Sequence, residues 1–211
     1  PIAFDSEENV WVGTLNGLNV YNRKTKNFRR FFPSSDIGSI SSEEINTVHV
    51  DSEKIWIGSK AGLDAIDIKS KNVERYMWSK WIPITGQAHV TQIVPFKKGT
   101  PMEGFWMATI GGLVYFNKSM ELFEDVIHEK IFGRYISDIF NDNAGNLAIL
   151  IPQSSGLIYL NTYNFYNMYG FIDQENDIYH CLKENHPKSL KSNNVKHVYF
   201  DDLNNAWVST D

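Results

Sequence analysis

The sequence has almost no cysteine and no long hydrophobic run. Cys181 is the only cysteine, so no disulfide can form within the chain. The longest uninterrupted apolar run, residues 147–151, is far shorter than the ~20 residues that a membrane helix needs. Basic residues form no stripe and the net charge is -5, which argues against a nucleic-acid partner. The chain starts at Pro1 without a signal segment, and we interpret both ends as cut boundaries.

Motifs for catalysis and metal binding are missing as well. There is no Gly-rich phosphate loop, no nucleophile elbow and no His-Glu-x-x-His pattern. His180 precedes Cys181, but neighbours in a strand point to opposite faces and cannot share a metal. Asp142 opens a turn rich in Asp, Asn and Gly that lacks the final Glu of a calcium loop. We therefore expect no cofactor, no metal and no catalytic residue.

What the sequence does contain is a repeat built on Trp and Gly. In three copies a Trp precedes a Gly-Leu pair by six residues. These pairs are Trp11 with Gly17, Trp56 with Gly62, and Trp106 with Gly112. A copy without Trp starts at Leu147, and Trp207 starts a further one. The copies lie roughly 40 to 60 residues apart, close to the spacing of propeller blades.

Each copy predicts four short antiparallel strands. An alternating segment comes first, as in residues 45–50, and a polar turn follows it. The Trp segment is the second strand, and the third begins at the Gly. The fourth strands carry Phe28, Val73, Phe123 and Phe165. Such a sheet cannot bury its apolar face alone, so copies must stack around an axis with the Trp between sheets.

The predicted fold is therefore all-β, a partial β-propeller of about four and a half blades. The first blade is expected to lack its opening strand and to hold strands two to four. The expected segments are a partial blade at 1–32, blades at 45–78 and 90–127, a degenerate blade at 136–169, an inter-blade insertion at 170–194 and the start of a further blade at 195–211.

The motif Trp-Val-Gly-Thr followed by Gly-Leu, with Asp before it and Tyr-Asn after it, resembles the two-component regulator propeller repeat. This resemblance implies the periplasmic sensor region of a membrane-anchored hybrid two-component system from Bacteroidetes, with the histidine kinase outside this chain. It further implies glycan sensing, control of transcription, and a ring of seven blades of which this chain is a fragment. The open ends of such a fragment favour a homodimer.

Long connections between the blades are the expected place for a ligand. They leave the sheets on the same face as the turns between strands two and three, and loops on a rigid scaffold carry recognition. Trp78, Lys80 and Trp81 combine indole rings with a cation, which suits a stacked sugar ring. The candidate ligand-binding residues are Trp78, Lys80, Trp81, His89, Arg134, Tyr179, His180 and Lys183. Against this, the two Trp residues can simply pack on a neighbouring blade.

Three functions follow from these features. The first is a non-catalytic sensor segment that binds an oligosaccharide. The second is a scaffold that binds protein or dimerises through its open edges. The third is a propeller-fold polysaccharide lyase or hydrolase, for which the sequence offers no convergent acid and base groups.

Overall fold

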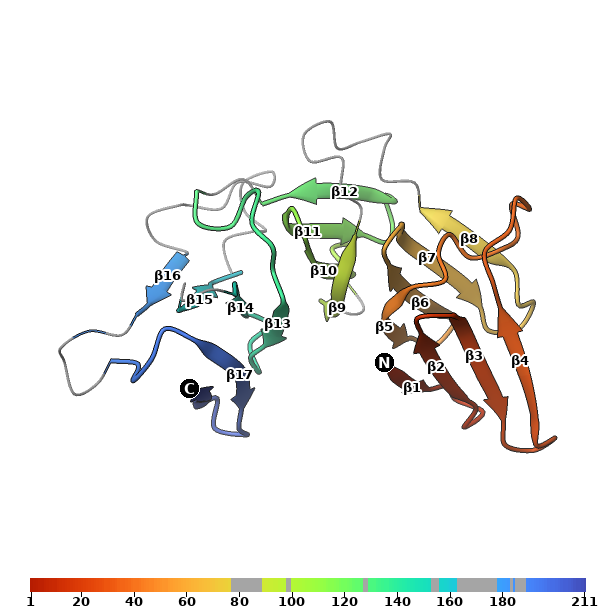
Figure 1. The fold of residues 1–211 in the computed structure, drawn as a ribbon, viewed down its shortest axis with the longest axis horizontal. Coiled ribbons are helices and arrows are strands. Elements are labelled where there is room, and N and C mark those ends of the chain that lie inside the picture. Colours follow the sequence, from red (N-terminus) through yellow and green to blue (C-terminus); the bar gives the residue numbers. More distant parts are fainter. Residues whose placement is uncertain are drawn as a thin grey trace. The chain divides into compact units, whose positions relative to one another are not determined.

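The computed structural model describes residues 1–76, 89–97, 100–126, 129–152, 156–162, 178–182, 184 and 189–211. The chain divides into two compact units, residues 1–93 and 94–211. The described residues form strands and turns, and no helix among them is long and apolar enough to cross a membrane. The strands pair into five antiparallel sheets (Figure 1), so the predicted partial propeller is confirmed.

The first unit contains two four-stranded sheets. The first sheet has the order β1 (Ile2–Phe4), β2 (Val10–Thr14), β3 (Gly17–Asn22) and β4 (Asn27–Phe31). The second has the order β5 (Ile45–Val50), β6 (Lys54–Ser59), β7 (Gly62–Asp67) and β8 (Val73–Tyr76). Consecutive strands pair because short turns join them.

The second unit contains the remaining sheets, and its first strand, β9, starts just before the boundary. The third sheet joins β9 (Val90–Phe96), β10 (Gly104–Thr109), β11 (Gly112–Asn117) and β12 (Leu122–Asp125). The fourth joins β13 (Asp138–Asn141), β14 (Leu147–Leu150), β15 (Leu157–Leu160) and β16 (Ile178–Cys181). The fifth has two strands, β17 (Val195–Phe200) and β18 (Ala206–Thr210).

Two strands differ from the prediction. The first sheet is not partial: β1 pairs with β2 through Ala3 and Trp11, so the opening strand is present. Three residues suffice for it because the turn that follows holds it in register. In the fourth sheet, β16 supplies the last strand and pairs Leu157 with Cys181. It lies inside the segment that was predicted as an insertion, whereas Phe165 lies outside the described residues.

The core follows from burial of the middle strands on both faces. All side chains of β10 and β11 are buried, while β4 is exposed except for Phe31. A strand covered on both faces needs a continuous apolar run, and an outer strand does not. Gly58 allows the close approach of the neighbouring strands, because a Cβ atom there would lie 2.6 Å from Val90 Cγ1.

The Gly that opens each third strand has the positive φ that its place in the repeat predicts. At Gly17 φ is +86°, and a Cβ atom there would lie 2.5 Å from the carbonyl oxygen of Phe31. Only Gly has room for both the conformation and the contact. The tight turn between β2 and β3 depends on it.

Candidate functional site

The turn between the first and second strands is organised by an aspartate that binds the repeat tryptophan. The indole Nε1–H of the Trp donates to Oδ2 of an Asp that lies before it in the sequence. The pairs are Trp11 with Asp5 at 3.0 Å, Trp56 with Asp51 at 2.7 Å and Trp207 with Asp201 at 2.9 Å. Sequence reasoning missed this role, although the Asp recurs before the Trp and was available as a signal.

Asp5 shows how the turn affects ionisation. Burial raises the pKa of this carboxyl, but hydrogen bonds from Trp11, Asn9 and the backbone N–H of Glu7 outweigh it, and the net pKa is lowered. Asn9 donates through both its backbone N–H and its Nδ2, each at 2.9 Å. The turn is therefore built around a carboxylate that stays ionised.

The fourth sheet has no tryptophan and uses a tyrosine instead. Ala148 stands at the Trp position and pairs across the sheet with Tyr159. The Tyr159 hydroxyl donates to Oδ2 of Asp142, which also accepts from Asn146 at 2.9 Å. Burial and the hydrogen bond to Asp142 raise the pKa of Tyr159 to about 12. The carboxylate keeps an aromatic donor although the donor comes from the next strand.

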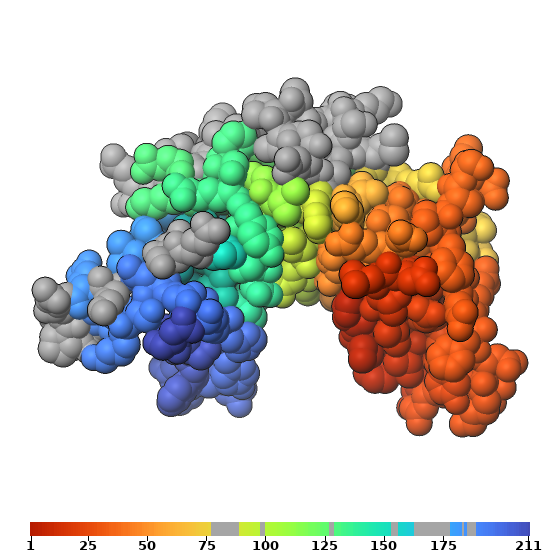
Figure 2. All heavy atoms as spheres, in the orientation of Figure 1, coloured from red at the N-terminus to blue at the C-terminus, as the bar shows by residue number. Residues whose placement is uncertain are grey.

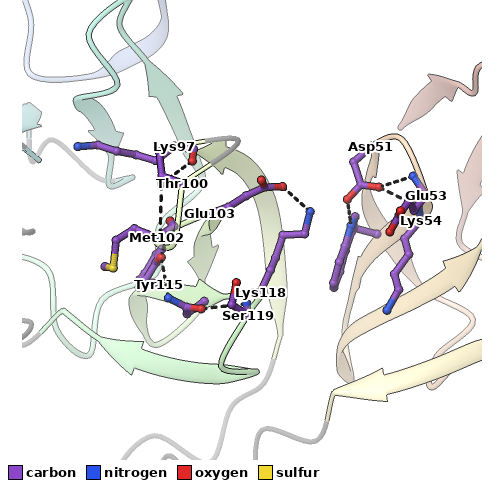
Figure 3. Close-up of polar contacts among 12 residues, drawn as sticks. Asp51, Glu53, Lys54, Lys97, Thr100, Met102, Glu103, Tyr115, Lys118 and Ser119 are labelled. Carbon is purple, nitrogen blue, oxygen red and sulfur yellow. Dashed lines mark hydrogen bonds and ion pairs between the residues drawn. The ribbon is translucent and has the colours of Figure 1, made fainter.

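The third sheet departs further, since Lys97 occupies the place of the Asp. Figure 3 shows its turn held by other groups: the Tyr115 hydroxyl donates to the carbonyl oxygen of Met102 at 2.7 Å. Lys118 forms an ion pair with Glu103 at 2.7 Å. In the second sheet, by contrast, Asp51 accepts from the backbone N–H groups of the turn (Figure 3).

The repeat tryptophans differ in exposure. Trp11, Trp56 and Trp106 are at most 2% exposed, whereas Trp207 is 65% exposed. The sequence predicted that the indole side chains of all four tryptophans would be buried between neighbouring sheets. Trp207 differs because it lies on the opposite face of β18 from Val208, and the Val208 face is the one that packs against the fourth sheet.

The candidate ligand-binding residues fall into two groups. Trp78, Lys80, Trp81 and Lys183 lie outside the described residues. His89 is half-buried just before β9, and Arg134 is exposed in the connection that leads to β13. Tyr179 and His180 were expected in a loop insertion, but they lie on β16, where Tyr179 pairs with Tyr159. The reason is that this segment supplies the last strand of the fourth sheet.

The connections between sheets do meet the turns between strands two and three, as expected. Gly17 donates its backbone N–H to the carbonyl oxygen of Glu43 at 2.7 Å. In the fourth sheet, Gly156 donates in the same way to Asn193 at 2.9 Å. Both connections therefore lie against the edge of a rigid sheet.

Two charged residues of the second sheet hold the connection between the first two sheets. Arg75 on β8 donates from Nε to the carbonyl oxygen of Ser39 at 2.7 Å and from its guanidinium to further carbonyls at Ser34 and Asp36. Asp64 on β7 is buried and accepts from Ser41 N–H at 2.7 Å. Burial raises the pKa of Asp64, although hydrogen bonds from Ser41 and the charge of Arg75 oppose the shift.

Two cavities open among the turns of the first unit. One of about 310 Å³ is lined by Ser6, Glu7, Ser52, Glu53, Asp67, Ile68 and Lys69. The other, of about 220 Å³, is lined by Glu7, Asn9, Val20, Asn22, Thr25, Asn27, Phe28, Arg29 and Lys71. Glu7 contributes to both. They lie at the turns after the first and third strands, the opposite edge from the long connections that the sequence favoured.

No group of three or more His, Cys, Asp or Glu side chains that could hold a metal occurs among the residues that the structure describes. Cys181 on β16 is an exposed residue with a free thiol, and partial desolvation by the surrounding protein raises the pKa of that thiol.

No protein-family model matches the sequence, and no curated protein matches it. Solved structures do match. The extracellular domain of the putative one-component system BT4673 from B. thetaiotaomicron is 18% identical with a TM-score of 0.72, over 99% of this chain and 25% of that chain. The extracellular domain of the putative hybrid two-component system BT3049 from the same organism is 18% identical with a TM-score of 0.63, over 99% and 32%.

A virginiamycin B lyase from Staphylococcus aureus also matches, at 11% identity and a TM-score of 0.66, over 99% of this chain and 62% of that chain. The chain thus spans about a quarter to a third of the extracellular domains and less than two thirds of the lyase. At these identities the likeness concerns the fold. The chain has the fold of part of a β-propeller and resembles the extracellular domains of Bacteroides two-component systems.

Proposed function

We propose that the chain is a non-catalytic part of an extracytoplasmic sensor region, which binds a glycan-derived ligand and signals to a kinase outside this chain. The observation that carries this proposal is the match of the whole chain to two sensor ectodomains. Both are 18% identical to it, compared with 11% for the lyase of the same fold. In such a protein the segment lies in the periplasm and takes part in controlling transcription.

The arrangement of the sheets suits this role. The connection between the first two sheets is held by the side chains of Arg75 and Asp64. A ligand that bridges two turns can therefore change the spacing of rigid sheets, which is a means of transmitting binding through the array.

The test is a calorimetric titration of this chain, and of the longer protein that contains it, with plant and host oligosaccharides. Saturable binding by the chain supports a sensor segment with its site in these blades. Binding by the longer protein alone would move the site elsewhere, and binding by neither would favour the scaffold that dimerises or binds protein.

The sequence also predicts which substitutions weaken the binding of an oligosaccharide. Trp78→Ala and Trp81→Ala should lower the affinity for an oligosaccharide without unfolding the chain. Trp207→Ala is the matched control, because it removes an exposed indole outside that connection. Unchanged affinity in both variants would remove the connection from the site.

A further inference from the structure

Each sheet has two faces of different composition. One face carries the side chain at the repeat Trp position of the second strand, and we call it the Trp face. The residues on either side of that position, together with those paired with them, form the opposite face, which we call the aliphatic face. In the first sheet Trp11 belongs to the Trp face, and Val10 and Val12 belong to the aliphatic face. The repeat therefore gives each sheet the same two faces.

Within each unit, neighbouring sheets join a Trp face to an aliphatic face. The core cluster of the first unit holds Trp11 from the Trp face of the first sheet and Ile57 from the aliphatic face of the second. In the second unit, one cluster holds Trp106 from the third sheet and Ile149 from the aliphatic face of the fourth. The fourth and fifth sheets meet in the same way. In all three contacts the Trp face of one sheet packs on the aliphatic face of the next.

The first sheet has an exposed aliphatic face. One row of directly paired residues crosses its four strands on this face: Phe4, Val10, Tyr21 and Phe28. Phe4 is 64% exposed and Phe28 is 66% exposed, whereas Val73, at the place of Phe28 in the second sheet, is 8% exposed. Figure 2 shows β1, in the darkest red, at the surface of the molecule. No sheet among the described residues covers this apolar row.

The fifth sheet has an exposed Trp face. Tyr199 on β17 pairs directly with Trp207 on β18, and the two side chains are 60% and 65% exposed. The opposite face of the same strands, with Val198 and Val208, belongs to the cluster shared with the fourth sheet. The exposed face thus has the position in its sheet that the Trp11 face has in the first sheet, where it packs on an aliphatic face.

We propose that the Trp face of the fifth sheet packs on the aliphatic face of the first sheet in a second copy of the chain. One chain exposes both halves of the contact that joins its own neighbouring sheets, and burying the two apolar faces together is favourable. Such an interface is heterologous, so the copies associate head-to-tail and either close into a ring or continue. It uses sheet faces, whereas the sequence favoured strand edges. It goes beyond the proposed function and needs no ligand, so either can fail alone.

The experiment is analytical ultracentrifugation of the chain over a range of concentrations, with one charged substitution on each face. Phe4→Lys changes the aliphatic face of the first sheet, and Tyr199→Lys changes the Trp face of the fifth. We expect the mass of the native chain to rise with concentration. Each variant should weaken association about ten-fold or more, because an unpaired charge is costly in an apolar interface. Leu15→Lys is the matched control: Leu15 is also exposed but lies in the turn between β2 and β3, so association should not change.

A mixture of the two variants tests the head-to-tail order. Phe4→Lys keeps an intact Trp face and Tyr199→Lys keeps an intact aliphatic face, so the mixture should form a dimer with one copy of each. Circular dichroism of each variant alone shows whether it is folded. Association that neither substitution weakens, or folded variants that do not associate on mixing, would overturn the proposal. A native chain that stays monomeric at every concentration would also overturn it and would leave a sheet of the longer protein as the occupant of each face.

Discussion

Tyr159 donates its hydroxyl hydrogen to Oδ2 of Asp142, at the position where other sheets use an indole. It can do so because Ala148, directly opposite on β14, is small. The aromatic donor has thus moved from the second strand to the third while its acceptor stayed in place. The turn of the fourth sheet thus keeps its aromatic donor and carboxylate acceptor although a different residue supplies the donor.

This exchange predicts a rescue. Tyr159→Phe removes the donor and should lower the free energy of unfolding by about 1–3 kcal/mol, because a half-buried hydrogen bond to a carboxylate is lost. The double variant Ala148→Trp with Tyr159→Val rebuilds the Trp–Val pair of the first sheet, where Trp11 pairs with Val20. It should be more stable than Tyr159→Phe in urea unfolding. A double variant less stable than Tyr159→Phe would show that the sheets are not interchangeable.

The lowered pKa of Asp5 predicts a loss of stability in acid. Its stabilising contribution is present above the pKa of the unfolded chain, 3.8, and is lost as the pH falls through the lower folded value. Asp5→Asn should therefore be less stable than the native chain at pH 7 and approach it at low pH. Unfolding in urea across this range measures the difference. A difference that does not vary with pH would mean that the charge of Asp5 is unimportant.

The buried Asp64 predicts the opposite dependence. Its folded pKa is raised, so its contribution is complete below 3.8 and is lost as the pH rises through the folded value. Asp64→Asn keeps a partner for Ser41 and should gain stability relative to the native chain as the pH rises. Asp64→Ala is the control: it removes both bonds to Ser41 and should cost about 1–3 kcal/mol. A decline of Asp64→Asn relative to the native chain with rising pH would refute the raised pKa.

Arg75 predicts local opening of the first connection. Arg75→Gln removes the guanidinium that binds the carbonyl oxygens of Ser34, Asp36 and Ser39. Hydrogen exchange of residues 34–41 should become faster by ten-fold or more, because charge-assisted hydrogen bonds contribute about 1.5–3 kcal/mol each. The exchange of β6 should not change, which separates local opening from global unfolding. Unaltered exchange in the connection would show that Arg75 does not hold it.

The contact at Gly58 predicts overpacking. In Gly58→Ala the new Cβ atom meets Thr47 Cγ2 and, at 2.6 Å, Val90 Cγ1, and the chain should lose about 1–3 kcal/mol. Adding Val90→Ala should recover part of that loss in a double-mutant cycle. Strictly additive effects of the two substitutions would mean that the two residues do not press on each other.

Most of the fold could be predicted from local signals. The spacing of Trp and Gly located the second and third strands, and alternation located β5 and β17, because these patterns depend on neighbours along the chain. The short β1 was missed because three residues carry too little pattern. β16 was missed because the repeat places the fourth strand soon after the third. The apolar segment at Phe165 fits that spacing, whereas β16, which pairs with β15, lies further along the chain.

The site was predicted less well than the fold. Tyr179 and His180 looked like loop residues, yet they belong to a strand whose identity depends on its pairing with β15.

The sequence by itself determined the repeat, the all-β class and the positions where glycine is required, since a left-handed turn or a buried indole imposes one residue type locally. The tertiary structure alone decided which strand closes the fourth sheet, which donor serves Asp142 and which carbonyls Arg75 binds. Those choices join residues far apart in the chain, and they are made by burial and hydrogen-bond satisfaction in the folded protein rather than by local preference.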